Sequence, residues 1–327
     1  MSIDPSELED RLDSLVATID SHETVEEGPT TTATNEKLTV CADISDVDYC
    51  RSVSALKDNI QTGDIYQMVP AHSFSAPCKS TYAAYRHLRA TNPSPYMFYM
   101  RGITPIACNS NKTYKLIGAS SESNLKLDPS TREVQLYPIA GTRPRGLNPD
   151  GSINHELDIR AELDMRTNVK EIAEHTMLVD LARNDLALVS LPTTRRVVEL
   201  LPVNRYSRVM HLVSRVVTTL DPEFDAIDTY RACMNMGTLT GASKLRAMEL
   251  LRGVAAKRRG SYGGSMDTCI VIRSAFIQDG VAVVQAGAGV VRDSIPQSEA
   301  DETLHKAYAV LHAIALAAGK DLEVIRS

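Results

Sequence analysis

Two pairs of glutamates have the spacing that most directly suggests chemistry. Glu171 and Glu174 lie three residues apart in one segment with helical patterning, and Glu299 and Glu302 repeat this spacing in another. Residues at i and i+3 share a helix face, so each pair can present two carboxylates to one point. Four converging carboxylates repel one another unless a cation lies between them, and their oxygen atoms suit Mg²⁺. On spacing alone a solvated helix face is the more common explanation, since Glu302 and Lys306 also form an ordinary i, i+4 ion pair.

Length and composition exclude several classes of protein. The 327 residues are 43% hydrophobic and 23% charged, which is typical of a soluble globular protein with one large or two ordinary domains. The net charge of −6 gives no basic field for nucleic acid, and no apolar run reaches membrane-spanning length. The six cysteines form no C-x-x-C pair and the N-terminus lacks a signal-peptide core, so we expect free thiols and a cytoplasmic location.

The order of predicted elements indicates an α+β fold. Strands come in clusters, without the regular alternation of a doubly wound sheet. Helical periodicity predicts helices at about 5–20, 47–62, 81–91, 168–185, 224–235, 242–256 and 298–318, the last with Ser298 as its N-cap. Strands are predicted around 65–69, 113–139, 206–217 and 268–291, the last as a hairpin that turns at Asp279-Gly280. We divide the chain into an N-terminal helix and polar linker (1–45), a catalytic domain (46–320) and a C-terminal tail (321–327).

Several further residues could take part in binding or catalysis. Gly287 and Gly289 follow a predicted strand, and glycine lets backbone amides approach an anion. On these residues alone, a glycine bulge in a sheet is the favoured explanation. Arg273, predicted in the strand facing them, and Lys306 could hold carboxylates.

Four more polar residues have a chemical and a structural explanation. Glu122 could be a general acid, but a surface carboxylate is the default. His211 lies in an apolar predicted strand, where a satisfied core histidine is more common than a catalyst. Thr142 and Thr238 stand at loop starts, where turn chemistry accounts for them.

Longer runs of sequence resemble anthranilate synthase component I, which belongs to the chorismate-utilising enzymes. The resemblance covers residues 48–318 and rests on these runs, in order: GDIYQMVP, NPSPYMFYM, YPIAGTRPRG, AELDMRTNVKE, HTMLVDLARNDL, YSRVMHLVSRVV, YRACMNMGTLTGASK and QAGAGVVRDSIPQSEADET. It implies the chorismate-binding fold of that family, with antiparallel strands in a β-sandwich-like core and helices packed outside.

The resemblance also implies a reaction and assigns roles. Chorismate would bind with Mg²⁺, ammonia from a glutaminase subunit would add at C2 as the 4-hydroxyl leaves, and pyruvate would be eliminated to give anthranilate. Metal ligation is implied for Glu174 and Glu302, with Glu171 and Glu299 as neighbouring ligands. Substrate binding is implied for Gly141, Thr142, Arg273, Ala286, Gly287, Ala288, Gly289 and Lys306. Roles at the reacting centre are implied for Glu122, which would protonate the departing hydroxyl, and for His211, Thr238 and Gln67.

Two positions separate this chain from relatives with other nucleophiles. Relatives that add water, and make isochorismate or salicylate, carry lysine where this chain has Gln67, and a glutamine cannot act as a base. Aminodeoxychorismate synthase uses a lysine nucleophile where this chain has Ala140, which offers none. Both positions favour ammonia, with isochorismate or salicylate synthesis as an alternative.

The chain departs from the family in two places. It retains one part of the family's tryptophan site (Asn92, Pro93, Ser94, Pro95, Tyr96 and Met97), whereas the N-terminal part of that site has no counterpart. We therefore expect weak tryptophan inhibition or none, which calorimetric titration with tryptophan tests. The family's Gly-Tyr-Phe segment after Gly264 is also missing. This gap favours a further alternative, an impaired or inactive fragment that serves only in binding or assembly.

Overall fold

A seven-stranded sheet carries the largest core of the protein. The computed structural model describes residues 10–14, 16–17, 36–106, 110–150, 152–206, 209–255, 259–264 and 269–326. The strand order is β18-β1-β3-β17-β16-β5-β4, and all neighbours are antiparallel except β18 and β1. The strands are β1 (Lys37–Ala42), β3 (Ala71–Pro77), β4 (Tyr96–Ile106), β5 (Ser110–Ser120), β16 (Ser274–Gln278), β17 (Val281–Gly287) and β18 (Asp321–Ile325).

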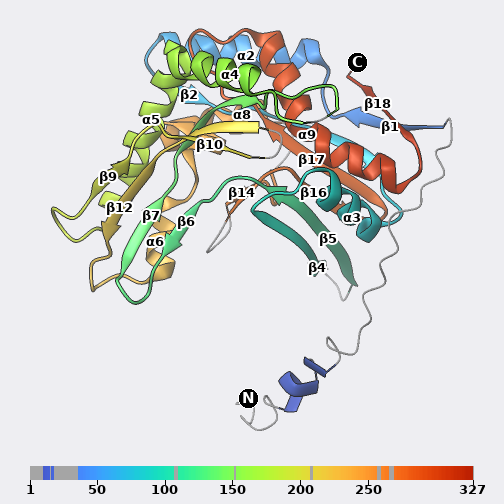
Figure 1. The fold of residues 1–327 in the computed structure, drawn as a ribbon, viewed down its shortest axis with the longest axis horizontal. Coiled ribbons are helices and arrows are strands. Elements are labelled where there is room, and N and C mark those ends of the chain that lie inside the picture. Colours follow the sequence, from blue (N-terminus) through green and yellow to red (C-terminus); the bar gives the residue numbers. More distant parts are fainter. Residues whose placement is uncertain are drawn as a thin grey trace.

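Two helices, α3 (Thr81–Thr91) and α9 (Pro296–Ala317), cover one face of this sheet (Figure 1). Alternate residues of the central strands point toward them, because side chains along a strand alternate between its two faces. Val284 of β17 and Leu311 of α9 are fully buried in the resulting core. The sheet therefore fixes α9, and with it the helix turn that carries Glu299 and Glu302.

Replacing Leu311 by alanine tests this packing. Leu311 has no exposed surface, and removing a buried leucine side chain leaves a cavity that costs about 2–5 kcal/mol. We expect Leu311→Ala to lower the free energy of unfolding in urea by that amount. Leu245→Ala is the control, because Leu245 is 78% exposed, and its effect should stay within about 0.5 kcal/mol. Equal effects of the two substitutions would contradict the packing.

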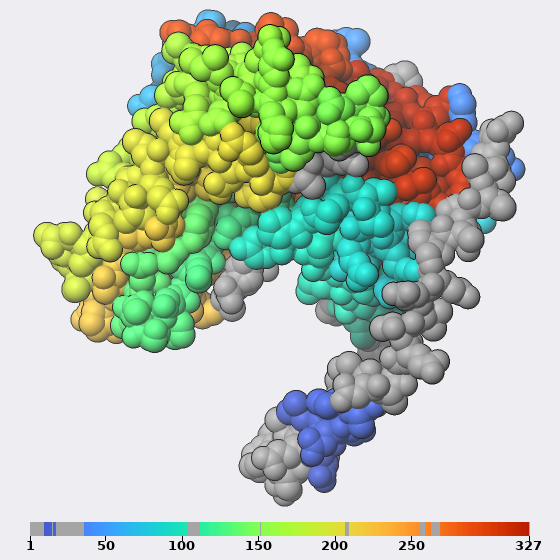
Figure 2. Space-filling view, viewed as in Figure 1, coloured from blue at the N-terminus to red at the C-terminus, as the bar shows by residue number. Residues whose placement is uncertain are grey.

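Smaller sheets and helices form a second body beside the large sheet (Figure 2). One sheet has the order β6-β7-β12-β9 and another β10-β11-β8, and two-stranded pairings join β2 to β13 and β14 to β15. These strands are β2 (Gln67–Met68), β6 (Leu125–Leu127), β7 (Glu133–Leu136), β8 (Ile139–Pro144), β9 (Arg196–Glu199), β10 (Val203–Arg205), β11 (Val209–Val213), β12 (Arg215–Thr219), β13 (Gly241–Ala242), β14 (Gly263–Gly264) and β15 (Ile270–Val271). The remaining helices are α2 (Asp46–Gln61), α4 (His155–Thr167), α5 (Val169–Ala187), α6 (Ala226–Cys233), α7 (Gly237–Thr240) and α8 (Lys244–Val254). Helix α5 packs on this second body through Leu186, which is fully buried.

The structure confirms the predicted α+β class and corrects several elements. Strands β1 and β18 were missed, because the predicted linker and tail covered them, and they pair with each other at the edge of the large sheet. The predicted strand 206–217 is two strands, β11 and β12, which belong to different sheets. Ser298 is not the N-cap of α9: the helix begins at Pro296 with Ile295 as N-cap, since proline suits the first helical turn.

Some expectations fall partly or wholly outside the described residues. Of the predicted helix 5–20, residues 10–14 and 16–17 are helical and the rest is not described. The same applies to the junction Ser265–Asp267 and to Cys108. The other five cysteines are free thiols, as expected. No described helix combines the length and hydropathy that crossing a membrane requires.

Candidate active site

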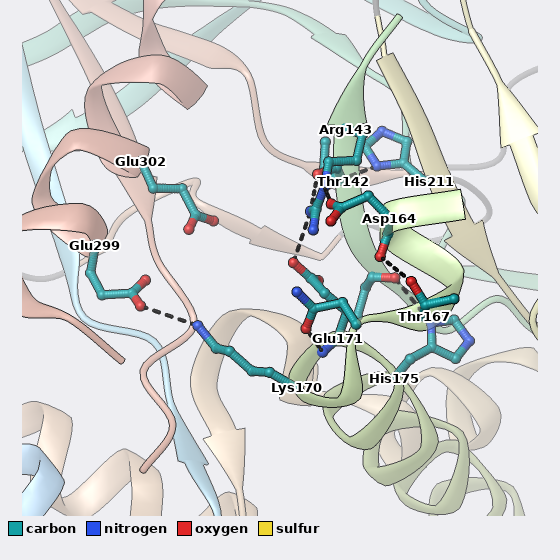
Figure 3. A network of polar contacts seen from close by, with 12 residues as sticks. Thr142, Arg143, Asp164, Thr167, Lys170, Glu171, His175, His211, Glu299 and Glu302 are labelled. Carbon is teal, nitrogen blue, oxygen red and sulfur yellow. Dashed lines mark hydrogen bonds and ion pairs between the residues drawn. The ribbon is translucent and has the colours of Figure 1, made fainter. Parts of the chain in front are cut away.

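Helices α5 and α9 bring the two glutamate pairs toward each other. The side chain of Asn168 caps α5 by accepting a hydrogen bond from the backbone N–H of Glu171, at 3.1 Å. This cap fixes the first turn of α5, from which Glu171 points toward α9. Figure 3 shows Glu171 on one side of a gap and Glu299 and Glu302 on the other. The fold therefore turns the first turn of α5 toward the turn of α9 that carries the other pair.

Each glutamate of the α9 pair has a lysine partner. Lys306 Nζ lies 2.7 Å from Glu302 Oε1 and donates a hydrogen bond to the Gly287 carbonyl at 2.9 Å. Burial opposes the charge on Lys306, but the nearby acidic groups, Glu302 foremost, together outweigh burial and raise the lysine pKa. Lys170 Nζ, on α5, lies 3.6 Å from Glu299 Oε1. The two glutamates are thus held by one cation from their own helix and one from the facing helix.

The carboxylates of α5 have different partners. Arg143 Nη1 on β8 donates to Glu171 Oε1 at 2.9 Å, while its Nε donates to Asp164 at 2.7 Å. Glu174 Oε1 instead accepts a hydrogen bond of 2.5 Å from the side-chain amide of Gln67. Burial, and then repulsion from Glu171, raise the pKa of Glu174 to about 7. Glu174 is therefore the carboxylate of this cluster with the weakest compensation for its charge.

The donor set suits a hard cation, although the side chains do not yet converge on one point. All four glutamates supply only oxygen atoms, the ligands that Mg²⁺ prefers. Repulsion from Glu302 also contributes to the raised pKa of Glu174, so the two helices share one electrostatic environment. Across the described residues, no three His, Cys, Asp or Glu side chains lie close enough together to hold a metal as they stand. The predicted metal site stays a prediction.

Gly289 lies directly against the contact between α5 and β2. A Cβ atom on Gly289 would lie 2.7 Å from Gln67 Nε2 and 2.8 Å from Glu174 Oε1, closer than real Cβ contacts. The glycine therefore leaves the space in which these two side chains meet. The predicted anion-binding role of the neighbouring amides is only partly available, because the Ala288 N–H donates to the Pro70 carbonyl at 3.3 Å.

Strands β8 and β11 pair Thr142 with His211. A hydrogen bond of 2.9 Å joins Thr142 Oγ1 to His211 Nδ1, and Gly141 turns the chain beside them with a φ of +84°. His211 is fully buried, and its Nε2 has no partner among the described residues. Burial, and then the charge of Arg273, lower the pKa of His211 to about 3. His211 is therefore a neutral imidazole with one nitrogen free to contact a ligand.

The depressed pKa of His211 predicts an acid-sensitive contribution to stability. The unfolded chain binds a proton on this histidine near pH 6.5, whereas the folded protein resists protonation down to about pH 3. Between pH 6.5 and 5 the folded protein should lose about 2 kcal/mol from this group. We expect the difference in free energy of unfolding between the native chain and His211→Asn to shrink by that amount, measured by urea unfolding. A constant difference would contradict the assignment.

Glu122 lies among groups predicted to hold substrate carboxylates. Burial raises the pKa of its carboxyl, and the charges of Arg273 and Lys306 oppose that effect. Arg273 does not lie in a strand as predicted: it precedes β16 with a φ of +48°. The charges of Arg273 and Lys306 therefore act on the Glu122 carboxyl, whose pKa remains raised by burial.

Thr238 has a free hydroxyl beside a cavity. It lies in the short helix α7, and its Oγ1 is buried without a partner in the described part of the chain. Thr238 lines a cavity together with Asn124, whose Nδ2 is also unpartnered among these residues. Unpaired buried polar atoms are costly, and a bound polar ligand would satisfy them.

The retained tryptophan-site residues form the connection between α3 and β4. Asn92 is the C-cap of α3, and Tyr96 opens β4. The Tyr96 hydroxyl donates to Ser123 Oγ at 3.0 Å, next to Glu122 in the chain. The segment is therefore linked to the candidate active site, and the weak response to tryptophan stays a prediction.

The sequence did not reveal two residues that complete the site. Lys170 was passed over, although it directly precedes Glu171, because a helix-surface lysine has no distinctive signal. Asn168 could have been found, since an asparagine three residues before a glutamate at the start of a helical pattern is typical of a cap.

Comparisons with known proteins agree with this fold. The chain belongs to the family described as chorismate binding enzyme, which it matches over residues 2–312. It is 55% identical to anthranilate synthase component 1 from Escherichia coli K12 over 84% of this chain and 52% of that protein. It is 54% identical to the same component from Vibrio parahaemolyticus over 85% of this chain and 51% of that protein. The chain thus spans about half the length of these relatives.

Solved structures share the fold. Anthranilate synthase component I from Streptococcus pneumoniae superposes with a TM-score of 0.77 at 32% identity, covering 94% of this chain and 66% of that one. The menaquinone-specific isochorismate synthase MenF from Escherichia coli gives a TM-score of 0.69 at 18% identity, covering 92% of this chain and 68% of that one. The latter likeness extends to the fold alone. The predicted family resemblance is confirmed.

Proposed function

We propose that this chain converts chorismate and ammonia to anthranilate and pyruvate, as a lyase of tryptophan biosynthesis. The proposal rests on the environment of the Gln67 side chain. It is 2% exposed, bonded to Glu174, and its Oε1 is unpartnered among the described residues. An amide in this place can bind a polar group but cannot deprotonate water. The identity of about 55% to anthranilate synthase component 1 supports the same reaction.

Glu122 acts as the general acid in this proposal. Burial raises the pKa of the Glu122 carboxyl, so Glu122 keeps its proton to a higher pH than an ordinary glutamate and can give that proton to the departing 4-hydroxyl. Arg273 and Lys306 bind the substrate carboxylates, while the neutral His211 contacts the ring through its free nitrogen. Thr238 offers its hydroxyl near the leaving group, and the substrate completes the hydrogen bonding of these buried atoms.

Mg²⁺ fits this site, held by Glu174 and Glu302, with Glu171 and Glu299 behind them. The bound ion would neutralise part of the negative charge of the substrate and its site. The raised pKa of Glu174 supports this assignment. Burial contributes most to it and repulsion from Glu171 and Glu302 adds to it, so a bound cation would offset part of the cost of this charge. A glutaminase subunit supplies the ammonia, since the relatives are each named as one component of a synthase. We place this reaction in the cytoplasm.

A fluorescence assay tests the proposed function. The purified chain is mixed with chorismate, MgCl₂ and ammonium chloride at alkaline pH, and anthranilate fluorescence is followed. Anthranilate formation supports the proposal. Isochorismate or salicylate as the product would show instead that water is the nucleophile despite Gln67. Lack of any product from a chain that unfolds cooperatively would favour a fragment that serves only in binding or assembly.

A further inference from the structure

Lys170 joins the two carboxylate helices from the solvent side. It is the second residue of α5, and its Nζ reaches Glu299 on α9 at 3.6 Å (Figure 3). Of the ion pairs formed by described residues, this is the one that links α5 to α9. The contact therefore spans the gap that a cation between the two glutamate pairs would enter.

The two partners of this ion pair differ sharply in burial. The Glu299 side chain is 4% exposed, whereas the Lys170 side chain is 39% exposed. A buried carboxylate needs a compensating charge, but a lysine head on a flexible stem can withdraw into water at little cost. Lys170 can therefore leave the pair more easily than Glu299 can.

The other cations at the site are held more firmly. Arg143 bridges Glu171 and Asp164, with its side chain 21% exposed. Lys306 combines its ion pair to Glu302 with a hydrogen bond to the Gly287 carbonyl. Lys170 has no second acceptor among the described residues. It is consequently the cation that a competing ion displaces first.

We propose that Lys170 is an internal counter-ion that occupies Glu299 in the metal-free protein and competes with the divalent cation. The inference rests on the proposed metal site and adds a residue that sets its affinity. When the divalent ion binds, Lys170 withdraws from Glu299 and its positive charge remains nearby. Both the competition and the repulsion weaken metal binding, while the pair limits carboxylate repulsion between the helices when no metal is present.

Metal titration of Lys170→Met tests the proposal directly. Methionine keeps the length and apolar stem of the side chain and removes its charge, and a positive charge at this helix N-terminus is unfavourable in any case. We expect the dissociation constant for Mn²⁺, measured by loss of the free-ion EPR signal, to fall about tenfold. Calorimetry with Mg²⁺ should show the same shift. Without metal, Lys170→Met should melt at a lower temperature than the native chain, because Glu299 has lost its counter-ion. Saturating metal should raise the melting temperature of the variant more than that of the native chain.

Two controls make the result specific. Lys320 lies beyond the other end of α9 and forms a comparable ion pair with Glu36 at 2.9 Å. Lys320→Met removes that pair and should leave metal affinity unchanged. Lys170→Arg keeps the charge and should bind metal as the native chain does. Equal or weaker binding by Lys170→Met than by the native chain overturns the inference alone. If neither the native chain nor Lys170→Met binds Mn²⁺, both the inference and the metal part of the proposed function are overturned.

Discussion

Glu122→Gln should lower kcat for anthranilate formation by about 10²–10⁴-fold, the usual contribution of a positioned general acid. Glutamine keeps the size of the side chain but cannot transfer a proton. Because the substrate carboxylates bind to other groups, KM should change far less than kcat. The measurement is steady-state anthranilate fluorescence with saturating ammonium and Mg²⁺.

The pH profile and the stability of this variant separate catalysis from structure. Burial raises the pKa of Glu122, so the acid form persists above the ordinary range of a glutamate, and native kcat should fall as pH rises through that value. This decrease of kcat with rising pH should be absent in Glu122→Gln. A raised carboxyl pKa also means that folding favours the protonated form, so the native chain loses stability as pH rises from the unfolded to the folded pKa. Glu122→Gln should therefore be no less stable than the native chain at pH 8.

A surface glutamate provides the control for Glu122. The Glu249 side chain on α8 is 66% exposed and pairs with Arg246, so Glu249→Gln should retain native kcat. If Glu122→Gln also retained native kcat with a native pH profile, Glu122 would not be the proton donor.

Local signals predicted most of the helices but missed α4, and they predicted the large sheet less well. Helix α3 ends where predicted, at Thr91, because proline at position 93 disfavours helical backbone before it. Strands β1 and β18 escaped prediction because each is completed by the opposite end of the chain, in a parallel pairing that leaves no local mark. The division of 206–217 into two strands depends on Ser214, whose Oγ bonds His175 at 2.7 Å and the backbone of Leu201 at 3.0 Å. Such contacts between distant segments have no periodicity to detect.

The candidate site was likewise predicted in part. The spacing of Glu171 and Glu174 marks a shared helix face, and the structure brings that face toward α9. The partners of these carboxylates could not be predicted, since Arg143 approaches from β8 and Gln67 from β2. For Gly289, a glycine bulge was the favoured explanation from sequence and an anion-binding loop the alternative. The structure shows a further reason for the glycine, which leaves space for the contact between Gln67 and Glu174.

Gly289→Ala should lower kcat/KM for chorismate by about 10²-fold, because displacing catalytic groups by about 1 Å costs that much. The new Cβ would lie 2.7 Å from Gln67 Nε2 and 2.8 Å from Glu174 Oε1. One of the two side chains must therefore move, which breaks their 2.5 Å hydrogen bond. Gln67 is 2% exposed, so its displacement would disturb a buried position.

A second glycine supplies the matched control. Gly253 lies in α8, and a Cβ there would meet no atom within 4 Å. Gly253→Ala should leave kcat/KM unchanged and raise the free energy of unfolding by up to about 1 kcal/mol, because alanine is the better helix former. Native kcat/KM in both variants would show that the Gln67–Glu174 contact does not matter to the reaction. Loss in Gly289→Ala alone, with cooperative unfolding preserved, would place that contact in the active site, since the two substitutions add the same single methyl group.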